Sequence, residues 1–198
     1  MTTNTLNKIL KEVRSCSHCI ADLPNGVRPV LQASANAKIL IAGQAPGAKV
    51  HASGIPFDDA SGKRLREWMG VDKTSFYDAN KIAILPMGFC YPGTGKSGDL
   101  APRRECADLW RADILALMPN IQLTLIIGQY ALHWHLPKMK KLTLTNTVKQ
   151  WRHFLPHQLP LPHPSPRNNI WLSKNPWFET DVIPELQRRI NSVLNKPD

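Results

Sequence analysis

Two short segments near the start of the chain carry groups suited to holding a flat polar ligand. GQAPG (43–47) follows an apolar run at 38–42, and its two glycines bracket a proline. Such a turn is stiff, and its backbone N–H groups can face a ligand. Phe57 lies between a proline and two aspartates in GIPFDDASG (54–62), an unusual place for a core aromatic, where an exposed ring can stack on a flat base. For GQAPG alone, an ordinary strand-to-helix turn is the alternative.

A third segment, LPHPSPRN (161–168), holds a histidine among prolines. The three prolines keep His163 on a rigid loop, which favours an active-site group that must not reorganise during a reaction. Ser165, Arg167 and Asn168 beside it supply donors of the kind that bind phosphate. If this segment is considered alone, the alternative is that the histidine has a structural role.

The four cysteines form two pairs, Cys16-x2-Cys19 and Cys90-x15-Cys106. Disulfides are not expected in a cytoplasmic chain, so the paired spacing favours a four-thiolate metal site. Zinc and an iron–sulfur cluster both accept four cysteines. Four buried free cysteines are the alternative.

The composition favours a polyanionic partner. The chain of 198 residues has 25 Lys and Arg against 15 Asp and Glu, a net charge of +10. Each neutralised phosphate releases counterions and adds affinity that is independent of sequence, although a basic surface can also serve solubility alone. The basic residues cluster at Lys63, Arg64 and Arg66, at Arg103 and Arg104, and at Lys138, Lys140 and Lys141.

No feature of the sequence predicts a membrane or secreted location. No apolar run approaches the roughly 20 residues of a membrane span. Lys8, Lys11 and Glu12 interrupt the N-terminal segment, which therefore lacks the apolar core of a signal peptide. We expect a cytoplasmic protein.

Apolar runs at 38–42, 81–87 and 123–128 predict three buried strands. Helical spacing predicts helices between and around them, over 4–14, 61–70, from Pro102 onward, from 129 and over 179–194. In detail, Ser61 is the expected N-cap of its helix with Gly70 just past the end, and Pro102 is expected in a first helical turn. The segment 156–166 is the one linker-like stretch. This alternation predicts an α/β fold with a parallel sheet covered on both faces, whose ligand site lies beyond the carboxyl ends of the strands.

Taken in order, these motifs resemble the uracil-DNA glycosylase superfamily, and most closely its family 4, the iron–sulfur branch. That branch typically reads GEAPG, then GxPF, then CRPPGNR, with its last cysteine on the following helix; GQAPG, GIPF and CYPGTGKSGD correspond here. The spacing of Cys90 and Cys106 matches, and the resemblance covers roughly residues 5–190. It implies a single domain over 1–198 with a central four-stranded parallel sheet flanked by helices on both faces.

The resemblance also implies a function, a monofunctional DNA glycosylase that hydrolyses the bond between the sugar and uracil, or a related deaminated base, in base-excision repair. The partner is then DNA containing such a base, and the protein is expected to be a monomer.

By position, His163 matches the donor to the departing base and Phe57 the ring that stacks on it. Gln44, Ala45 and Gly47 match the loop that holds the attacking water and the base edge. Pro164, Ser165, Pro166 and Arg167 match the loop that enters the minor groove, and Cys16, Cys19, Cys90 and Cys106 match the ligands of a structural [4Fe–4S] cluster, with zinc as the alternative.

Three positions depart from the pattern of this branch. Gln44 replaces its acid, so Asp58, Asp59 and His51 become candidates for orienting water. Pro86 stands where the branch has a base-reading asparagine, which opens hypoxanthine, xanthine or another lesion as substrate. The arginine-rich loop after the third cysteine has a lone lysine here.

Two other interpretations remain open. A non-catalytic DNA-binding or lesion-sensing member of the same fold is favoured by Gln44 and Pro86. A zinc-stabilised α/β nucleotide-binding domain, unrelated to the family, would bind zinc and free nucleotides.

Overall fold

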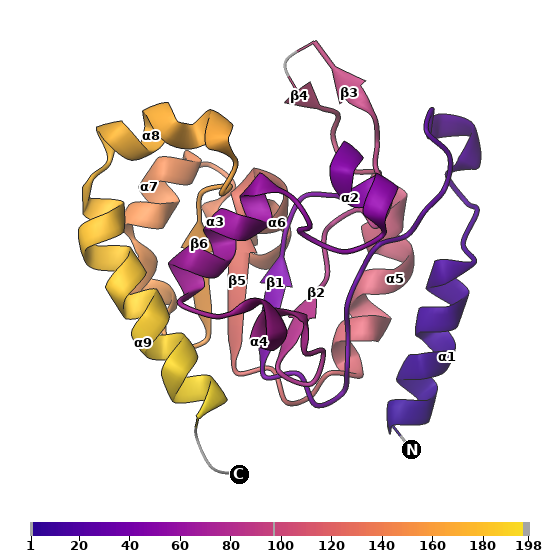
Figure 1. The fold of residues 1–198 in the computed structure, drawn as a ribbon, viewed down its shortest axis with the longest axis horizontal. Coiled ribbons are helices and arrows are strands. Elements are labelled where there is room, and N and C mark those ends of the chain that lie inside the picture. Colours follow the sequence, from indigo (N-terminus) through magenta and orange to yellow (C-terminus); the bar gives the residue numbers. More distant parts are fainter. Residues whose placement is uncertain (1, 97, 196–198) are drawn as a thin grey trace.

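The computed structural model describes residues 2–96 and 98–195 and is built around a parallel sheet (Figure 1). Its strand order is β2-β1-β5-β6, and every neighbouring pair is parallel. The strands are β1 (Ile39–Ala42), β2 (Ile82–Ile84), β5 (Leu123–Ile127) and β6 (Gln158–Leu161). The predicted α/β class and four-stranded sheet are therefore confirmed.

The central strands are buried on both faces, which is why they read as continuous apolar runs. Alternate side chains enter different cores. Ile39 and Ile41 point into the core that also contains Leu125, whereas Leu40 and Ala42 contribute to cores on the opposite face.

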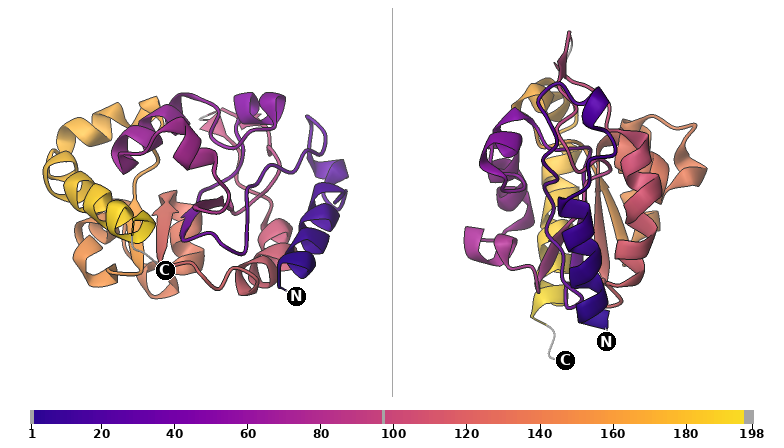
Figure 2. Two further views of the ribbon diagram at one scale, coloured as in Figure 1. Left: turned by 60° about the horizontal axis from the view of Figure 1, so that its bottom comes forward. Right: turned by 90° about the vertical axis from the view of Figure 1, so that its right-hand side faces the viewer.

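Helices complete both layers, as the right-hand view of Figure 2 shows for α3 and α4 on one side and α5 on the other. The first core receives side chains from α3 (Ala60–Met69), α4 (Lys73–Tyr77) and α9 (Ile183–Leu194). The opposite face is covered by α1 (Thr2–Arg14), α5 (Arg104–Ala116) and α6 (Gly128–His135).

Shorter elements connect this framework. They are the helices α2 (Ala48–Ser53), α7 (Leu144–Lys149) and α8 (Asn169–Lys174), the hairpin β3 (Thr94–Gly95) and β4 (Gly98–Asp99), single helical turns at Ile20–Asp22, Pro137–Met139, Trp151–Phe154 and Pro166–Asn168, and a π-helical turn at Phe178–Val182. The hairpin stands at the top of Figure 1, at the end of the molecule to which the carboxyl ends of the strands point.

The linker predicted at 156–166 was wrong, because this segment contains β6. Leu159 and Leu161 are fully buried beside β5. Pro160 is tolerated because β6 is an edge strand of the sheet, where a missing N–H breaks no inner ladder.

Two helix starts also differ from the prediction. The N-cap of α3 is Asp59, whose Oδ1 accepts a hydrogen bond from the Gly62 N–H at 2.8 Å, while Ser61 is buried inside the first turn. α5 begins at Arg104, so Pro102 lies before the helix and outside its first turn. The residue between them, Arg103, keeps an extended backbone with φ −63° and ψ 121°. Gly70, in contrast, ends α3 in the left-handed conformation, as expected.

Gly62 also fixes the loop that carries Phe57. A Cβ at position 62 would lie 1.7 Å from the Phe57 carbonyl oxygen, so only glycine allows α3 to approach this loop. Phe57 itself has a φ of +55°, a strained conformation for a residue with a side chain. The start of α3 thus holds a strained loop in place.

An arginine is completely buried beneath the carboxyl end of β2. The Arg111 guanidinium donates hydrogen bonds to the carbonyl oxygens of Leu85 (2.6 Å) and Pro86 (2.9 Å) and to His135 Nε2 (2.8 Å). It also lies 4.8 Å from the Trp134 ring centroid. Burial lowers the pKa of Arg111 to about 10, and burial together with the neighbouring guanidinium lowers the pKa of His135 to about 3. His135 is therefore a neutral acceptor for this arginine.

The contact at Gly62 leads to a stability prediction. Gly62→Ala places a methyl group against the Phe57 backbone, and overpacking of this kind costs about 1–3 kcal/mol of folding free energy or more. Lys63→Ala, at an exposed position of the same helix, is the control and should change stability by less than about 0.5 kcal/mol. Denaturant unfolding measures both, and equal stability of the two variants would contradict the assigned contact.

The Arg111–His135 pair predicts a pH dependence. The folded-state pKa of His135 lies below its unfolded value, so the unfolded chain binds more protons and stability falls as pH drops below about 6.5. His135→Gln keeps an acceptor for Arg111 and does not titrate. Between pH 7 and 5 the wild type should lose about 2 kcal/mol more than this variant in urea unfolding. Parallel curves for the two proteins would show that His135 is not buried in its neutral form.

Candidate active site

A cavity of about 310 Å³ lies at the carboxyl edge of the sheet. Its walls come from the loops after β1 (43–47), after β2 (Pro86) and after β6 (His163 and its neighbours), together with Phe57 and Asp59 before α3. Parallel strands bring these loops to one edge of the sheet. Its size is at the lower end of small-molecule sites, which run from about 300 to 1,000 Å³.

His163 lines this cavity and its ring is oriented by its own loop. The Ser165 N–H donates to His163 Nδ1 at 3.2 Å, and the Asn168 side chain donates to the His163 carbonyl oxygen at 2.7 Å. Burial lowers the pKa of His163, although the Asp59 and Asp99 carboxylates act in the opposite direction. The ring is therefore neutral near pH 7. Because Nδ1 accepts a hydrogen bond, the proton resides on Nε2, which makes that nitrogen a neutral donor.

Both the backbone and the side chain of Gln44 form hydrogen bonds with other parts of the chain. Its carbonyl oxygen accepts from the Gly88 N–H at 3.0 Å, next to a bond from the Met87 N–H to the Gly43 oxygen at 2.9 Å. Its side-chain amide donates to the Leu100 carbonyl oxygen at 3.1 Å. Gln44 thus joins the loop after β1 to the segments after β2 and after β4.

Phe57 forms one wall of the cavity. Its ring lies 6.3 Å from that of Phe76 in an edge-on arrangement, and its Cζ is 3.6 Å from the place where a Cβ of Gly43 would be. The ring is only partly buried, which leaves a surface for a ligand. Its placement agrees with a stacking residue.

The hairpin β3–β4 contributes a residue that the sequence reasoning missed, Asp99. Its carboxylate lines the cavity, with Oδ2 3.4 Å from the Cβ position of Gly47. A neighbouring cavity of about 250 Å³ between the hairpin and the loop after β6 is lined by Asp99, His163 and Arg167 among others. The hairpin has two residues per strand, too few for a pattern in the sequence.

Of the three candidates for orienting water in place of an acid at position 44, only Asp59 lines the cavity. His51 Nε2 is 3.0 Å from the Asn25 carbonyl oxygen, and its ring packs beside Tyr91. Asp58 is also not among the lining residues.

The loop after β6 is held from the side by an arginine of α3. The Arg64 guanidinium donates to the Ser165 carbonyl oxygen at 3.1 Å, and Arg167 packs over Gly98 of the hairpin, where a Cβ would lie 2.4 Å from Arg167 Nη1. Ser165, Pro166 and Arg167 line the main cavity, whereas Pro164 is buried behind it.

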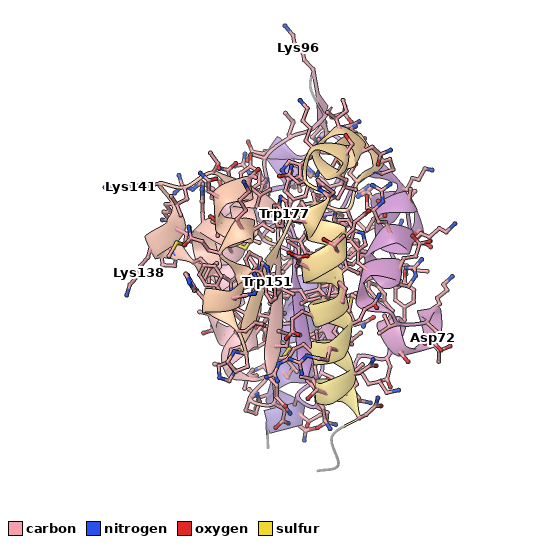
Figure 3. The ribbon with its side chains drawn as sticks, turned by 90° about the vertical axis from the view of Figure 1, so that its left-hand side faces the viewer. Asp72, Lys96, Lys138, Lys141, Trp151 and Trp177 are labelled. Carbon is pink, nitrogen blue, oxygen red and sulfur yellow. The ribbon has the colours of Figure 1, made fainter. Side chains whose placement is uncertain are left out.

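The basic clusters seen in the sequence do not form one face. Arg66 lies over the Phe76 ring at 5.3 Å, and Arg103 pairs with Asp22 at 3.0 Å. In Figure 3, Lys138 and Lys141 project from one flank, whereas Lys96 is at the tip of the hairpin. Two basic residues, Lys49 of α2 and Arg167 of the loop after β6, line the main cavity, whereas Lys96 lines neither cavity.

The four cysteines line one small cavity of about 20 Å³ behind the loop after β2. Cys16 and Cys19 follow α1, Cys90 follows β2 and Cys106 lies in the first turns of α5, so the two sequence pairs meet in space. Burial, opposed by the Phe89 N–H that donates to its sulfur at 3.3 Å, raises the pKa of Cys106 to about 12, and the other three thiols add to the rise. In the described residues, no group of three or more His, Cys, Asp or Glu side chains has the spacing of a formed metal site.

Among the helices of residues 2–96 and 98–195, none combines the length and apolarity needed to cross a membrane.

The comparison with protein families agrees with this architecture. The family model described as the uracil DNA glycosylase superfamily matches residues 31–187. The match includes the loops that form the cavity, as well as Cys90 and Cys106, and it begins after Cys16 and Cys19. Because it covers most of the chain, the protein belongs to the uracil DNA glycosylase superfamily.

Proposed function

We propose that this protein is a monofunctional DNA glycosylase that hydrolyses the N-glycosidic bond of uracil or a related deaminated base in DNA. The observation that carries the proposal is the neutral His163, which has its donor proton on Nε2 and lines a base-sized cavity. A base within the duplex is out of reach, so the enzyme must flip the nucleotide into the cavity at a cost of a few kcal/mol.

In this mechanism the charge on the leaving base decides the rate. Breaking the bond leaves negative charge on the base, and a fixed donor stabilises it because the donor need not reorganise. His163 Nε2–H is that donor, and a neutral imidazole avoids the cost of burying a second charge. Phe57 stacks on the flipped base, and the backbone of Gln44, Ala45 and Gly47 meets its edge.

The DNA itself is held by the rim of the cavity. The loop of Pro164, Ser165, Pro166 and Arg167 enters the minor groove, and Lys96 on the hairpin meets the phosphates. Arg64 and Asn168 keep this loop from moving when DNA binds, through their hydrogen bonds to Ser165 and His163.

The choice of lesion cannot depend on a side chain at position 86. Pro86 has no side-chain donor, and its carbonyl oxygen already accepts a hydrogen bond from Arg111. The backbone of 43–47, which lines the cavity, is the proposed reader of the base edge, and hypoxanthine and xanthine are candidate substrates beside uracil.

Cys16, Cys19, Cys90 and Cys106 are the proposed ligands of a structural [4Fe–4S] cluster, with zinc as the alternative at the same thiols. The four thiols line one void, and both groups take four thiolate ligands, which supports the proposal. The bound group would supply cross-linking and no chemical step, since it joins the segment after α1 to the loop after β2 and to α5. That loop pairs with Gly43 and Gln44, so the cross-link supports the floor of the active site.

A lesion-sensing protein without turnover is the second candidate. It is favoured by Gln44, whose side-chain amide is neutral and already donates to Leu100.

Base release from matched oligonucleotides tests the function. The panel carries uracil, hypoxanthine, xanthine or no lesion, and alkaline strand cleavage reports abasic sites. His163→Ala should lower the single-turnover rate by about 10²–10³-fold, because one donor to the developing charge is lost. Its affinity for the same DNA should stay within a few-fold of the wild type.

His157→Ala is the matched control for this experiment, since His157 does not line the cavity. Full activity of His163→Ala would refute the role of the histidine. If the wild type releases no base but retains lesion DNA more tightly than undamaged DNA, the sensor is correct.

The cysteine site has a separate test. Cys106→Ser should lose the bound metal and lower the midpoint of thermal unfolding, as measured by elemental analysis and circular dichroism on protein purified without oxygen. About four iron atoms per wild-type chain indicate the cluster, whereas one zinc indicates the alternative. Ser17→Ala, at an exposed position between the first two cysteines, is the control. A metal-free wild type as stable as the serine variant would show that the cysteines bind nothing.

A further inference from the structure

Hydrolysis at the sugar requires a water molecule held and deprotonated beside the cavity, and Gln44 is not suited to this task. Its amide has no charge, and the nitrogen already donates to the Leu100 carbonyl oxygen. Among the described residues, two carboxylates line the cavity, those of Asp59 and Asp99.

One carboxylate oxygen of Asp59 already has a structural role. Its Oδ1 caps α3 through the Gly62 N–H, a contact that stabilises the helix start and holds the side chain in one orientation.

The carboxylate of Asp99 has no such structural role among the described residues. Within residues 2–96 and 98–195, its carboxylate has no hydrogen-bonding or ion-pair partner, although it lies close enough to His163 to act on the charge of the ring. It lines the main cavity and also the neighbouring one, in both cases together with Gln44 and His163. The exposed carboxylate of Asp99 therefore lines the same cavity as the donor to the base and the loop after β1.

Two contacts hold the backbone on either side of Asp99. Gln44 donates to Leu100, the next residue along the chain, and Arg167 packs on Gly98, the residue before. The carboxylate itself lies beside Gly47, with Oδ2 3.4 Å from the position that a Cβ would take there. The glutamine in GQAPG thus positions the segment that carries the acid.

We infer that Asp99, supplied by the β3–β4 hairpin, is the catalytic carboxylate that orients and deprotonates the attacking water. This inference rests on the proposed glycosylase function and deepens it. The water oxygen forms a bond to the anomeric carbon as the bond from that carbon to the base nitrogen breaks, and the electron pair of the broken bond leaves with the base. One water proton stays on the new sugar hydroxyl. The other passes to Asp99 and from there through solvent to the base.

The test compares Asp99→Asn with Asp113→Asn, the same substitution at an exposed acid of α5 outside the cavity. The substrate is an oligonucleotide with the lesion that the wild type excises, under single-turnover conditions. A general base contributes about 10²–10⁴-fold, so Asp99→Asn should slow base release by at least about 10²-fold, whereas Asp113→Asn should stay within about twofold of the wild type.

DNA affinity is the second measurement and separates catalysis from structure. Removing a negative charge near the phosphates should leave the dissociation constant of Asp99→Asn unchanged or lower than that of the wild type. Weaker binding together with a lowered unfolding midpoint would mean that Asp99 only supports the hairpin, and the inference would fail. Wild-type rates in Asp99→Asn would also overturn it.

These failures differ from a failure of the proposed function. If the wild type releases no base from any lesion, the glycosylase proposal falls and the Asp99 inference falls with it. If the wild type is active and Asp99→Asn equals it, only the inference is lost. In that case Asp59→Asn, tested in parallel, identifies whether the other carboxylate of the cavity activates the water.

Discussion

The parallel pairing of β2, β1, β5 and β6 is the constraint on which the rest of the structure depends. Parallel strands end at one edge, so loops that are up to 120 residues apart in the chain, from Gly43 to His163, converge there. The strands can be short and mostly apolar because helices cover both faces, and their ladders satisfy the buried backbone groups. Loops anchored to such a sheet give a preorganised site, which is what stabilising a developing charge requires.

Charged groups are used sparingly inside this framework. Arg111 is completely buried. Just beyond the end of β2, its guanidinium donates hydrogen bonds to the carbonyl oxygens of Leu85 and Pro86. Burial lowers the pKa of both His135 and His163, and at His135 the neighbouring Arg111 guanidinium lowers it further because a second buried cation would be costly. Both histidines therefore work as hydrogen-bonding groups. The carboxylates of Asp59 and Asp99 are then the negative charges of the cavity among the described residues.

The net charge of +10 says less about the DNA interface than it first suggests. Arg64, Arg66 and Arg103 all have partners within the protein, and the lysines after α6 lie on a flank. A long-range field can still attract DNA. Local binding would depend on few residues, with Lys49 and Arg167 lining the cavity and Lys96 at the tip of the hairpin.

By itself, the sequence determined the class of fold, three of the four strands of the sheet and most helices. Apolar runs and helical spacing are local signals, and the motifs GQAPG, GIPF and HPSPRN place Gln44, Phe57 and His163 in loops after or near strands. The tertiary structure alone decided the features that depend on distant partners. Pro160 predicts a linker from sequence, but the edge position of β6 tolerates a proline in the strand. Nothing in its local sequence distinguishes Arg111 from other helical arginines, and its role follows from its hydrogen bonds to the carbonyl oxygens of Leu85 and Pro86. Asp99 could not be found because a hairpin with two residues per strand has no periodicity. Its position depends on Gln44 and Arg167, whose contacts with the hairpin segment exist only after the chain has folded.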